Sequence, residues 1–194
     1  RIILDDYNID RSENQEHLII RPYPSKYVEL WKTHDNRSVT IRPIRPEDEM
    51  MERELLTGLS KETQRLRFFQ PIKDITHEML TRFCNIDYDR EMAFVAETVD
   101  RDGKRKIVGV ARLILTGDNE QGEYAVVNAD GWQHVGLGLK LSDKIVGFAR
   151  EKSVKNIYAI TLSDNIRMIN LGKKLGFNLK SRPDGEVELS LDLS

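Results

Sequence analysis

The sequence has one cysteine, Cys84, and lacks any hydrophobic run long enough to cross a membrane. A single cysteine excludes an internal disulfide and a zinc site built from cysteines, and it fits a reducing compartment. Spanning a bilayer takes about 20 consecutive apolar residues, and the first residues do not resemble a signal peptide. We therefore expect a cytoplasmic protein that does not bind membranes.

An excess of charge of one sign is also lacking, because 30 Lys and Arg residues oppose 32 Asp and Glu residues, for a formal net charge of -2. Domains that bind nucleic acids carry a clustered basic surface, so we expect no nucleic-acid partner. His17, His34, His77 and His134 have no metal-ligand spacing, so we expect no metal. A chain of 194 residues, 39% of them hydrophobic, is long enough for one domain with a sizeable core.

Residues 1–37 have a different pattern from the rest of the chain. They are rich in charge and contain two short extended candidates, His17–Arg21 and Tyr27–Trp31, around an Arg-Pro-Tyr-Pro stretch that excludes helix. We interpret 1–37 as an arm that follows a preceding domain. The chain begins without methionine, so we interpret it as part of a longer polypeptide. Residues 38–194 are expected to form the domain.

From residue 38 onward, apolar periodicity predicts alternating strands and helices. Strands are predicted at Ser38–Ile44, Met92–Ala96, Ile107–Leu115, Glu123–Ala129, Ile157–Leu162 and Val187–Leu193. Helices are predicted after Pro46, after the capping residues Ser60 and Thr76, and over Leu137–Arg150 and Asn165–Leu175. This order, with a run of strands joined by hairpin turns in the middle, predicts a mixed α/β fold.

The segment Glu123–Gly138 joins an apolar strand to the start of an amphipathic helix and contains Gln133-x-x-Gly136-x-Gly138. Glycine permits positive φ and close backbone approach, and a helix start presents free N–H groups to a phosphate. A plain strand-to-helix turn explains a bare Gly-x-Gly equally well. Two better-known phosphate loops do not fit, because Leu141 stands where a dinucleotide motif needs glycine and no Gly-Lys-Ser/Thr follows.

The loop resembles the pyrophosphate-binding motif of the GNAT acetyltransferases, Gln/Arg-x-x-Gly-x-Gly/Ala. Asn165, followed by Leu175-Gly-Phe177, is similar to a second stretch of that superfamily. Further segments resemble the bacterial Pat-type protein lysine acetyltransferases: His17–Pro24, Arg42–Asp48, Leu66–Phe69, Ile86–Met92 and Val110–Arg112. In those proteins a GNAT domain is fused to a region related to NDP-forming acyl-CoA synthetases. The resemblance covers essentially the whole chain and implies the GNAT fold, a mostly antiparallel central sheet with helices on both faces.

The resemblance also implies acetyl-CoA as co-substrate. A bulge in the strand Glu123–Ala129 is expected to separate it from its neighbour and to free backbone groups for the pantetheine arm. An N–H group near Val127 is expected to bind the oxyanion, and Asn165 to cap a helix and reach the cofactor. The residues expected to bind acetyl-CoA are Val126, Val127, Asn128, Gln133, His134, Val135, Gly136, Leu137, Gly138 and Asn165.

Glu123 is the candidate general base. A lysine amine has a pKa of about 10.4, so about one in 10³ to 10⁴ is nucleophilic at neutral pH, and a positioned base is typically worth about 10²–10⁴ in rate. By residue type alone, Glu123 fits a solvated acid at a strand start. GNAT enzymes often have a glutamate ten residues before the loop glutamine, which favours the base. Many also have a tyrosine acid where this chain has Gly172.

The predicted function is transfer of an acetyl group to a lysine of a protein, an acyl-CoA synthetase by the Pat-type resemblance, through direct attack of the amine. Asp87, Asp89 and Glu91 fit either an acidic rim for a lysine peptide or a solvated turn. Cys84 lies on an apolar helical face and is interpreted as core. The alternatives are acetylation of a small-molecule amine, and a non-catalytic acetyl-CoA-sensing module that regulates the fused region.

Overall fold

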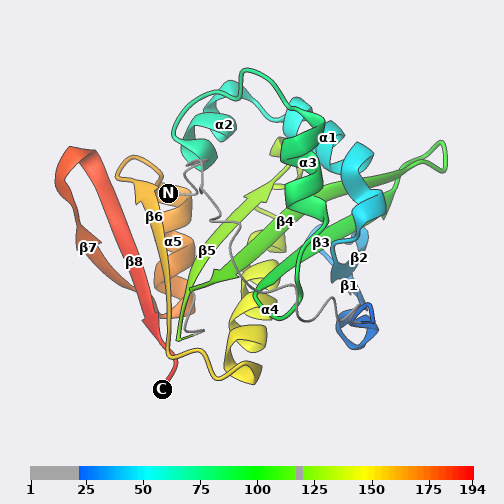
Figure 1. Ribbon diagram of the computed structural model, residues 1–194. Helices are drawn as coiled ribbons and strands as arrows, with labels where there is room; N and C mark the ends of the chain where they lie inside the picture. The colour runs from blue at the N-terminus through cyan, green and yellow to red at the C-terminus, as the bar shows by residue number, and fades with distance from the viewer. Residues whose placement is uncertain (1–21, 117–119) are drawn as a thin grey trace.

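The computed structural model describes residues 22–116 and 120–194. Within them, one eight-stranded sheet has the order β1-β2-β3-β4-β5-β6-β8-β7 (Figure 1). The strands are β1 Glu29–Lys32, β2 Ser38–Pro43, β3 Glu91–Val99, β4 Arg105–Leu115, β5 Gln121–Asn128, β6 Asn156–Leu162, β7 Asn178–Ser181 and β8 Glu186–Asp192. The helices are α1 Glu49–Gly58, α2 Lys61–Phe68, α3 His77–Cys84, α4 Leu137–Glu151 and α5 Ile166–Leu175. Neighbouring strands are antiparallel except β5 and β6, which confirms the mixed, mostly antiparallel sheet.

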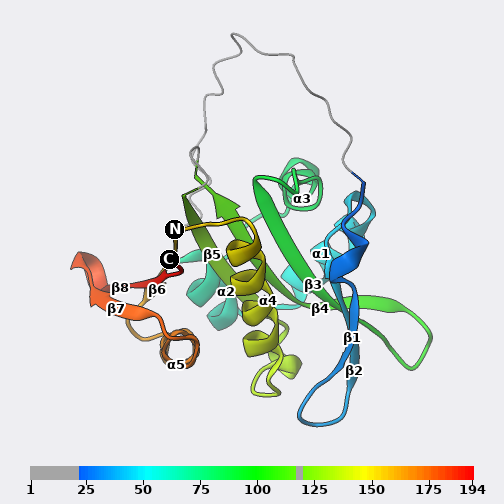
Figure 2. The ribbon, with the colours of Figure 1, turned by 90° about the horizontal axis from the view of Figure 1, so that it is seen from below.

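Helices cover both faces of this sheet (Figure 2). On one face, α4 packs against β3, β4 and β5, with Phe94 and Ile145 fully buried. On the opposite face lie α1 and α3, whose core includes Leu56. Side chains of β4 enter both cores, since Val110 points to one and Ala111 to the other. The long apolar run of β4 therefore reflects burial on both faces, as predicted.

The predicted caps start α2 and α3. The Ser60 hydroxyl accepts a hydrogen bond from the Thr63 N–H, and Thr76 does the same for Met79, each at 3.2 Å. At the start of α1, Arg42 donates hydrogen bonds from Nη1 and Nη2 to the two carboxylate oxygens of Asp48, both at 2.7 Å. The two caps determine where α2 and α3 begin, and the ion pair holds the start of α1.

The segment before residue 38 packs on the domain. Strand β1 pairs antiparallel with β2, and the ring of Tyr27 lies edge-on to Phe94 with centroids 5.4 Å apart. Tyr27, where the extended segment Tyr27–Trp31 was predicted to begin, instead ends a 3-10 turn of residues 25–27, and β1 begins only at Glu29. The candidate strand His17–Arg21 lies outside the described residues. The domain boundary at residue 38 stays a prediction.

Strand β7, Asn178–Ser181, was not predicted from the sequence. All of its residues are exposed, so it lacks the apolar alternation by which strands are recognised. Its pairing with β8 adds one strand at the edge of the sheet opposite β1.

Candidate functional site

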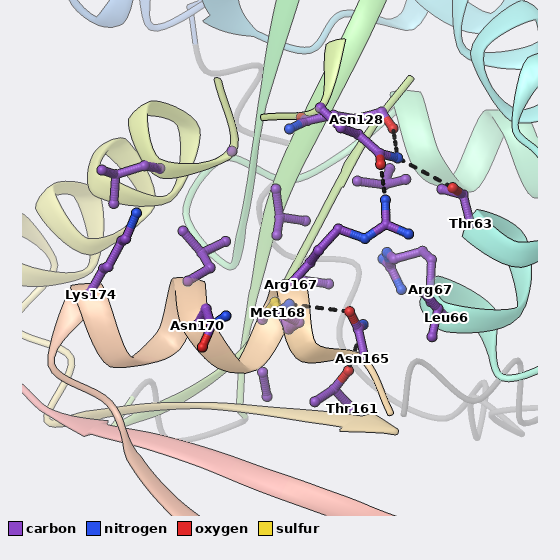
Figure 3. A pocket seen from close by; sticks show the side chains of 18 of the residues that line it. Thr63, Leu66, Arg67, Asn128, Thr161, Asn165, Arg167, Met168, Asn170 and Lys174 are labelled. Carbon is purple, nitrogen blue, oxygen red and sulfur yellow. Dashed lines mark hydrogen bonds between the residues drawn. The ribbon is translucent and has the colours of Figure 1, made fainter. Parts of the chain in front are cut away.

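Strands β5 and β6 are adjacent at one end and separate at the other (Figure 1). Their parallel ladder joins Gln121–Glu123 to Asn156–Tyr158 and goes no further. Beyond it lies a cleft of about 480 Å³, lined by β5, β6, α2, α5 and the loop before α4 (Figure 3). The expected separation of these strands is therefore present.

A bulge in β5 does not cause this separation. The register of β5 with β4 runs without a shift from Gly122 to Asn128. The register shift in this part of the sheet instead lies between β3 and β4, where Ala96 pairs with Gly109 and Glu97 with Ile107, so that Val108 of β4 is the extra residue. The pairing of β5 with β6 ends at Glu123 and Tyr158, and the expectation of a bulge in β5 is corrected accordingly.

Alternate residues of β5 direct their backbone groups into the cleft. In an antiparallel ladder, every second residue faces the same neighbour. The Ala129 N–H donates to Val108 O at 2.9 Å, so Val127 also faces β4. Val126 and Asn128 therefore direct their N–H and C=O groups toward the gap with β6. The donor expected near Val127 is thus Val126 or Asn128.

The glycine loop leads directly into α4. Gly136 is the residue before the helix and has φ of 83°, a left-handed conformation that favours glycine. The amides of the first turn of α4 are free of partners within the helix, as at every helix start. The Gln133 side chain braces the loop: its Nε2 donates to Thr63 Oγ1 at 3.3 Å, and its Oε1 accepts from Arg167. The loop is therefore held between α2 and α5.

Cationic side chains line the cleft. Arg67 reaches it from α2, and Arg167 and Lys174 reach it from α5 (Figure 3). Among the described residues, no Asp or Glu lines it. Burial, with Arg112 as the second cause, lowers the pKa of Arg67 to about 10, so the side chain stays charged at neutral pH. A cleft with cations and a helix start suits a ligand with several phosphate charges.

Most of the predicted cofactor residues meet at this cleft. Val135 and Leu137 are exceptions: the Val135 carbonyl accepts a hydrogen bond from the His34 N–H at 3.0 Å, and Leu137 is fully buried. Asn165 caps α5 as predicted, accepting from the Met168 N–H at 3.1 Å. The predicted residues that line the cleft are Val126, Val127, Asn128, Gln133, His134, Gly136, Gly138 and Asn165.

Glu123 is not among the residues that line this cleft. It lies where β5 and β6 still pair, opposite Tyr158, and alternation puts its side chain on the same face of β5 as Ala125 and Val127. It interacts electrostatically with Arg67, which does line the cleft. Its role as the base stays a prediction.

No tyrosine acid fits at position 172. Gly172 is buried, and a Cβ atom there would overlap with the Leu189 side chain. Tyr124 lines the cleft, but its hydroxyl is hydrogen-bonded to Ser142, and burial raises its pKa. The structure thus gives a packing reason for the glycine.

Two acids of the segment Asp87–Glu91 form ion pairs within the domain. Asp89 pairs with Lys152 at 2.8 Å, and Glu91 pairs with Arg112. Neither acid lines the cleft. Cys84 is fully buried, and burial raises the pKa of its thiol to about 12, in agreement with its interpretation as core.

Sequence reasoning missed several residues of the cleft. They come from three separate elements, the β1–β2 turn, α2 and α5, so no local spacing connects them; only Arg67 falls in a motif already noted, Leu66–Phe69. The missed residues are His34, Thr63, Arg67, Arg167 and Lys174. Among residues 22–116 and 120–194, no three His, Cys, Asp or Glu side chains gather as a metal site would require. In the same ranges, no helix is both long and apolar enough to cross a bilayer.

Comparison with known proteins agrees with this fold. Residues 38–178 match the family model described as the acetyltransferase (GNAT) domain. A curated relative, Acetyltransferase PA5475 of Pseudomonas aeruginosa, is 35% identical over 155 residues, which cover 80% of this chain and 83% of the relative. The chain therefore belongs to the GNAT acetyltransferase family.

Two solved structures have the same fold. The GNAT domain of S. lividans PAT superposes with a TM-score of 0.79 and 24% identity, covering 89% of this chain and 100% of that one. A phosphinothricin acetyltransferase from Sinorhizobium meliloti, in complex with AcCoA, gives a TM-score of 0.66 and 18% identity over 80% of this chain and 89% of that one. At these identities the likeness concerns the fold, and it confirms the GNAT fold expected from the sequence.

Proposed function

We propose that this GNAT domain binds acetyl-CoA in the cleft and transfers the acetyl group to a lysine side chain of another protein. The main support for this proposal is the composition of the cleft. Backbone groups of Val126 and Asn128 form one wall of the cleft, and the start of α4 forms one end. The charged side chains that line the cleft are cationic. Acetyl-CoA combines amides, a thioester and several phosphates, which such a cleft complements.

Each part of the cleft suits one part of acetyl-CoA. The N–H groups at the start of α4 and the loop from Gln133 suit the pyrophosphate. Arg167 and Lys174, on α5, suit the remaining phosphate charge. The backbone of Val126 and Asn128 suits the pantetheine amides by extending the pairing of β5. When bound, acetyl-CoA supplies the activated acetyl group.

The chain's own residues would then position charge and protons. An N–H group of Val126 or Asn128 donates to the thioester oxygen as negative charge develops on it. Glu123, directly or through water, takes a proton from the incoming amine. The thiolate takes its proton from water, because Gly172 offers no side chain there and the thiolate of a thiol with a pKa of about 8.5 is only a moderate base.

The choice of a protein lysine depends on the Pat-type resemblance of Arg42–Asp48, Leu66–Phe69 and Ile86–Met92. By that resemblance the substrate is an acyl-CoA synthetase, modified in the cytoplasm, and the full protein includes a fused synthetase-like region. The phosphinothricin acetyltransferase fold relative keeps a small-molecule amine as the second candidate. An acetyl-CoA-sensing module without turnover is the third.

One experiment separates these candidates. The protein is incubated with acetyl-CoA and an AMP-forming acyl-CoA synthetase, or with spermidine or phosphinothricin, while thiol release is recorded and lysines are mapped by mass spectrometry. We expect modification of the active-site lysine of the synthetase. Efficient acetylation of a small amine with every synthetase unmodified would contradict the lysine substrate. Binding of acetyl-CoA with no thiol release in any arm would favour the sensing module.

A further inference from the structure

Helix α1 carries a buried carboxylate that the scheme above does not use. Glu52 is only 3% exposed, and its Oε2 has no hydrogen-bond partner among the described residues. Arg67 Nε, on α2, is likewise buried without a partner in that part of the chain. Buried polar atoms are almost always hydrogen-bonded. Two buried atoms without a partner that lie near one another therefore indicate a polar site.

Both side chains line one small cavity between α1, α2 and the sheet. Its volume is about 20 Å³. A water molecule needs about 10–15 Å³ and two to four polar partners. Glu52 and Arg67 provide these partners, and Arg112 provides a third charged group, so the cavity suits one water. The other lining residues are Leu56, Phe68, Phe83, Val110, Ala125 and Val127.

The cavity adjoins the acetyl-CoA cleft. Arg67, Ala125 and Val127 line both hollows. They flank the stretch of β5 whose backbone would hold the thioester. Glu52 therefore lies behind this wall of the cleft, on the same face of the sheet as Glu123.

Building on the proposed acetylation of an amine, we propose that Glu52 is a second proton acceptor of the acetyl-transfer site, acting through one water in this cavity. Conversion of a lysine ammonium to an amide removes two protons from nitrogen. The departing thiolate takes one proton from water, so the net result is one proton released to solvent. Glu123 accepts the first nitrogen proton and returns it to solvent. For the other, an N–H bond breaks as an O–H bond forms on the water, and the water passes a proton to Glu52 Oε2. The neutral carboxyl then releases this proton to solvent.

The charges around Glu52 support proton exchange near neutral pH. Burial raises the pKa of Glu52 to about 7, against the opposing effect of Arg112 and Arg67. A group exchanges protons best when its pKa is near the working pH. The ionisable groups that face Glu52 are Asp48 just before α1, Arg67 on α2, Cys84 on α3 and Arg112 on β4. Glu91 and Glu123 interact in turn with Arg112 and Arg67.

Glu52→Gln tests the proposal, because it keeps the side-chain shape and removes the titratable group. Glu54→Gln is the matched control, since Glu54 lies on the same helix and pairs with Lys104 at 2.5 Å, outside both hollows. Single-turnover acetyl transfer to the amine substrate is measured across pH. We expect Glu52→Gln to lower the rate about 10²-fold and to remove an ionisation near pH 7. Acetyl-CoA affinity and the KM for the amine stay unchanged in both variants.

A second measurement does not depend on activity or on folding of the variant. The carboxyl carbons of wild-type glutamates are followed by ¹³C NMR during a pH titration, with and without CoA, and Glu52 is assigned by through-bond correlation to its own backbone amide. We expect the Glu52 signal to titrate with a midpoint near pH 7, and we expect this midpoint to shift when CoA binds. A pH–rate profile of Glu52→Gln that superimposes on wild type would overturn the proposal. A Glu52 midpoint that is the same with and without CoA would also overturn the proposal. A lack of transfer to any amine would contradict only the proposed function.

Discussion

The imidazole of His34 lies directly over Gly136, so that a Cβ atom at position 136 would come within 2.6 Å of His34 Nε2. His34 belongs to the turn between β1 and β2, and its N–H donates to Val135 O at 3.0 Å. Nearby, Arg37 donates to Gly131 O at 3.0 Å. The N-terminal hairpin is therefore joined to the loop that we expect to bind pyrophosphate.

This contact predicts that Gly136→Ala abolishes acetyl-CoA binding, because the added methyl meets the His34 ring and the φ of 83° is strained for alanine. The measurement is the rise in Tm as CoA is titrated. Gly131→Ala, in the same loop, is the matched control because a Cβ there meets nothing within 4 Å. Normal CoA stabilisation of the Gly136 variant would contradict the assignment of this loop.

The sequence predicts the loop but not its partner. Gly136 and Gly138 are recognisable because they fall between an apolar strand and a periodic helix. His34 is not recognisable, because it touches Gly136 only after β1 and β2 join the sheet. Contacts between distant elements leave no period in the sequence. The same reason explains why Arg167 and Lys174 were missed, although their helix was predicted.

The second prediction separates the candidate base from the binding site. Glu123→Gln should leave acetyl-CoA affinity nearly unchanged and lower turnover about 10²-fold or more near neutral pH. Raising the pH should restore part of the rate, since more amine is then unprotonated. The measurement is thiol release across pH, and Glu188→Gln on β8, outside the cleft, is the control. Near-normal turnover at neutral pH would mean that Glu123 is only a strand acid.

The third prediction concerns the ion pair of Arg42 and Asp48, whose side chains are each 3% exposed. Asp48→Asn removes one of the two carboxylates that neutralise the buried Arg42 guanidinium, Glu97 being the other, so it should lower the free energy of unfolding by about 1.5–3 kcal/mol. Urea denaturation measures this loss. Glu47→Gln, its exposed neighbour in the chain, should change stability little. Equal stability of the two variants would contradict the importance of this pair.

That pair also shows what a resemblance leaves unexplained. Arg42–Asp48 was noted as a family-like segment, and the structure supplies the physical reason for its two ends. Arg42 on β2 holds Asp48 at the start of α1, and Arg42 Nη2 also pairs with Glu97 at 2.6 Å. The identity of Glu97 as a partner was not predictable, because it depends on the register between β2 and β3.

The last prediction uses the pH dependence of stability. Burial raises the pKa of Glu52 from its usual 4.5 to about 7, so the folded protein binds more protons than the unfolded chain between these values. The contribution of Glu52 to stability is therefore fully present below pH 4.5 and is lost as pH rises to about 7. A shift of this size corresponds to about 3 kcal/mol.

Glu52→Gln removes this dependence. Relative to wild type, the variant should gain about 3 kcal/mol in the free energy of unfolding between pH 4.5 and pH 7. The gain should then stay constant at higher pH, because Glu52 is fully ionised in both states. Urea denaturation of wild type, Glu52→Gln and Glu54→Gln across this range measures the difference, and Glu54→Gln should follow wild type. Parallel curves for wild type and Glu52→Gln would show that Glu52 ionises normally in the folded protein.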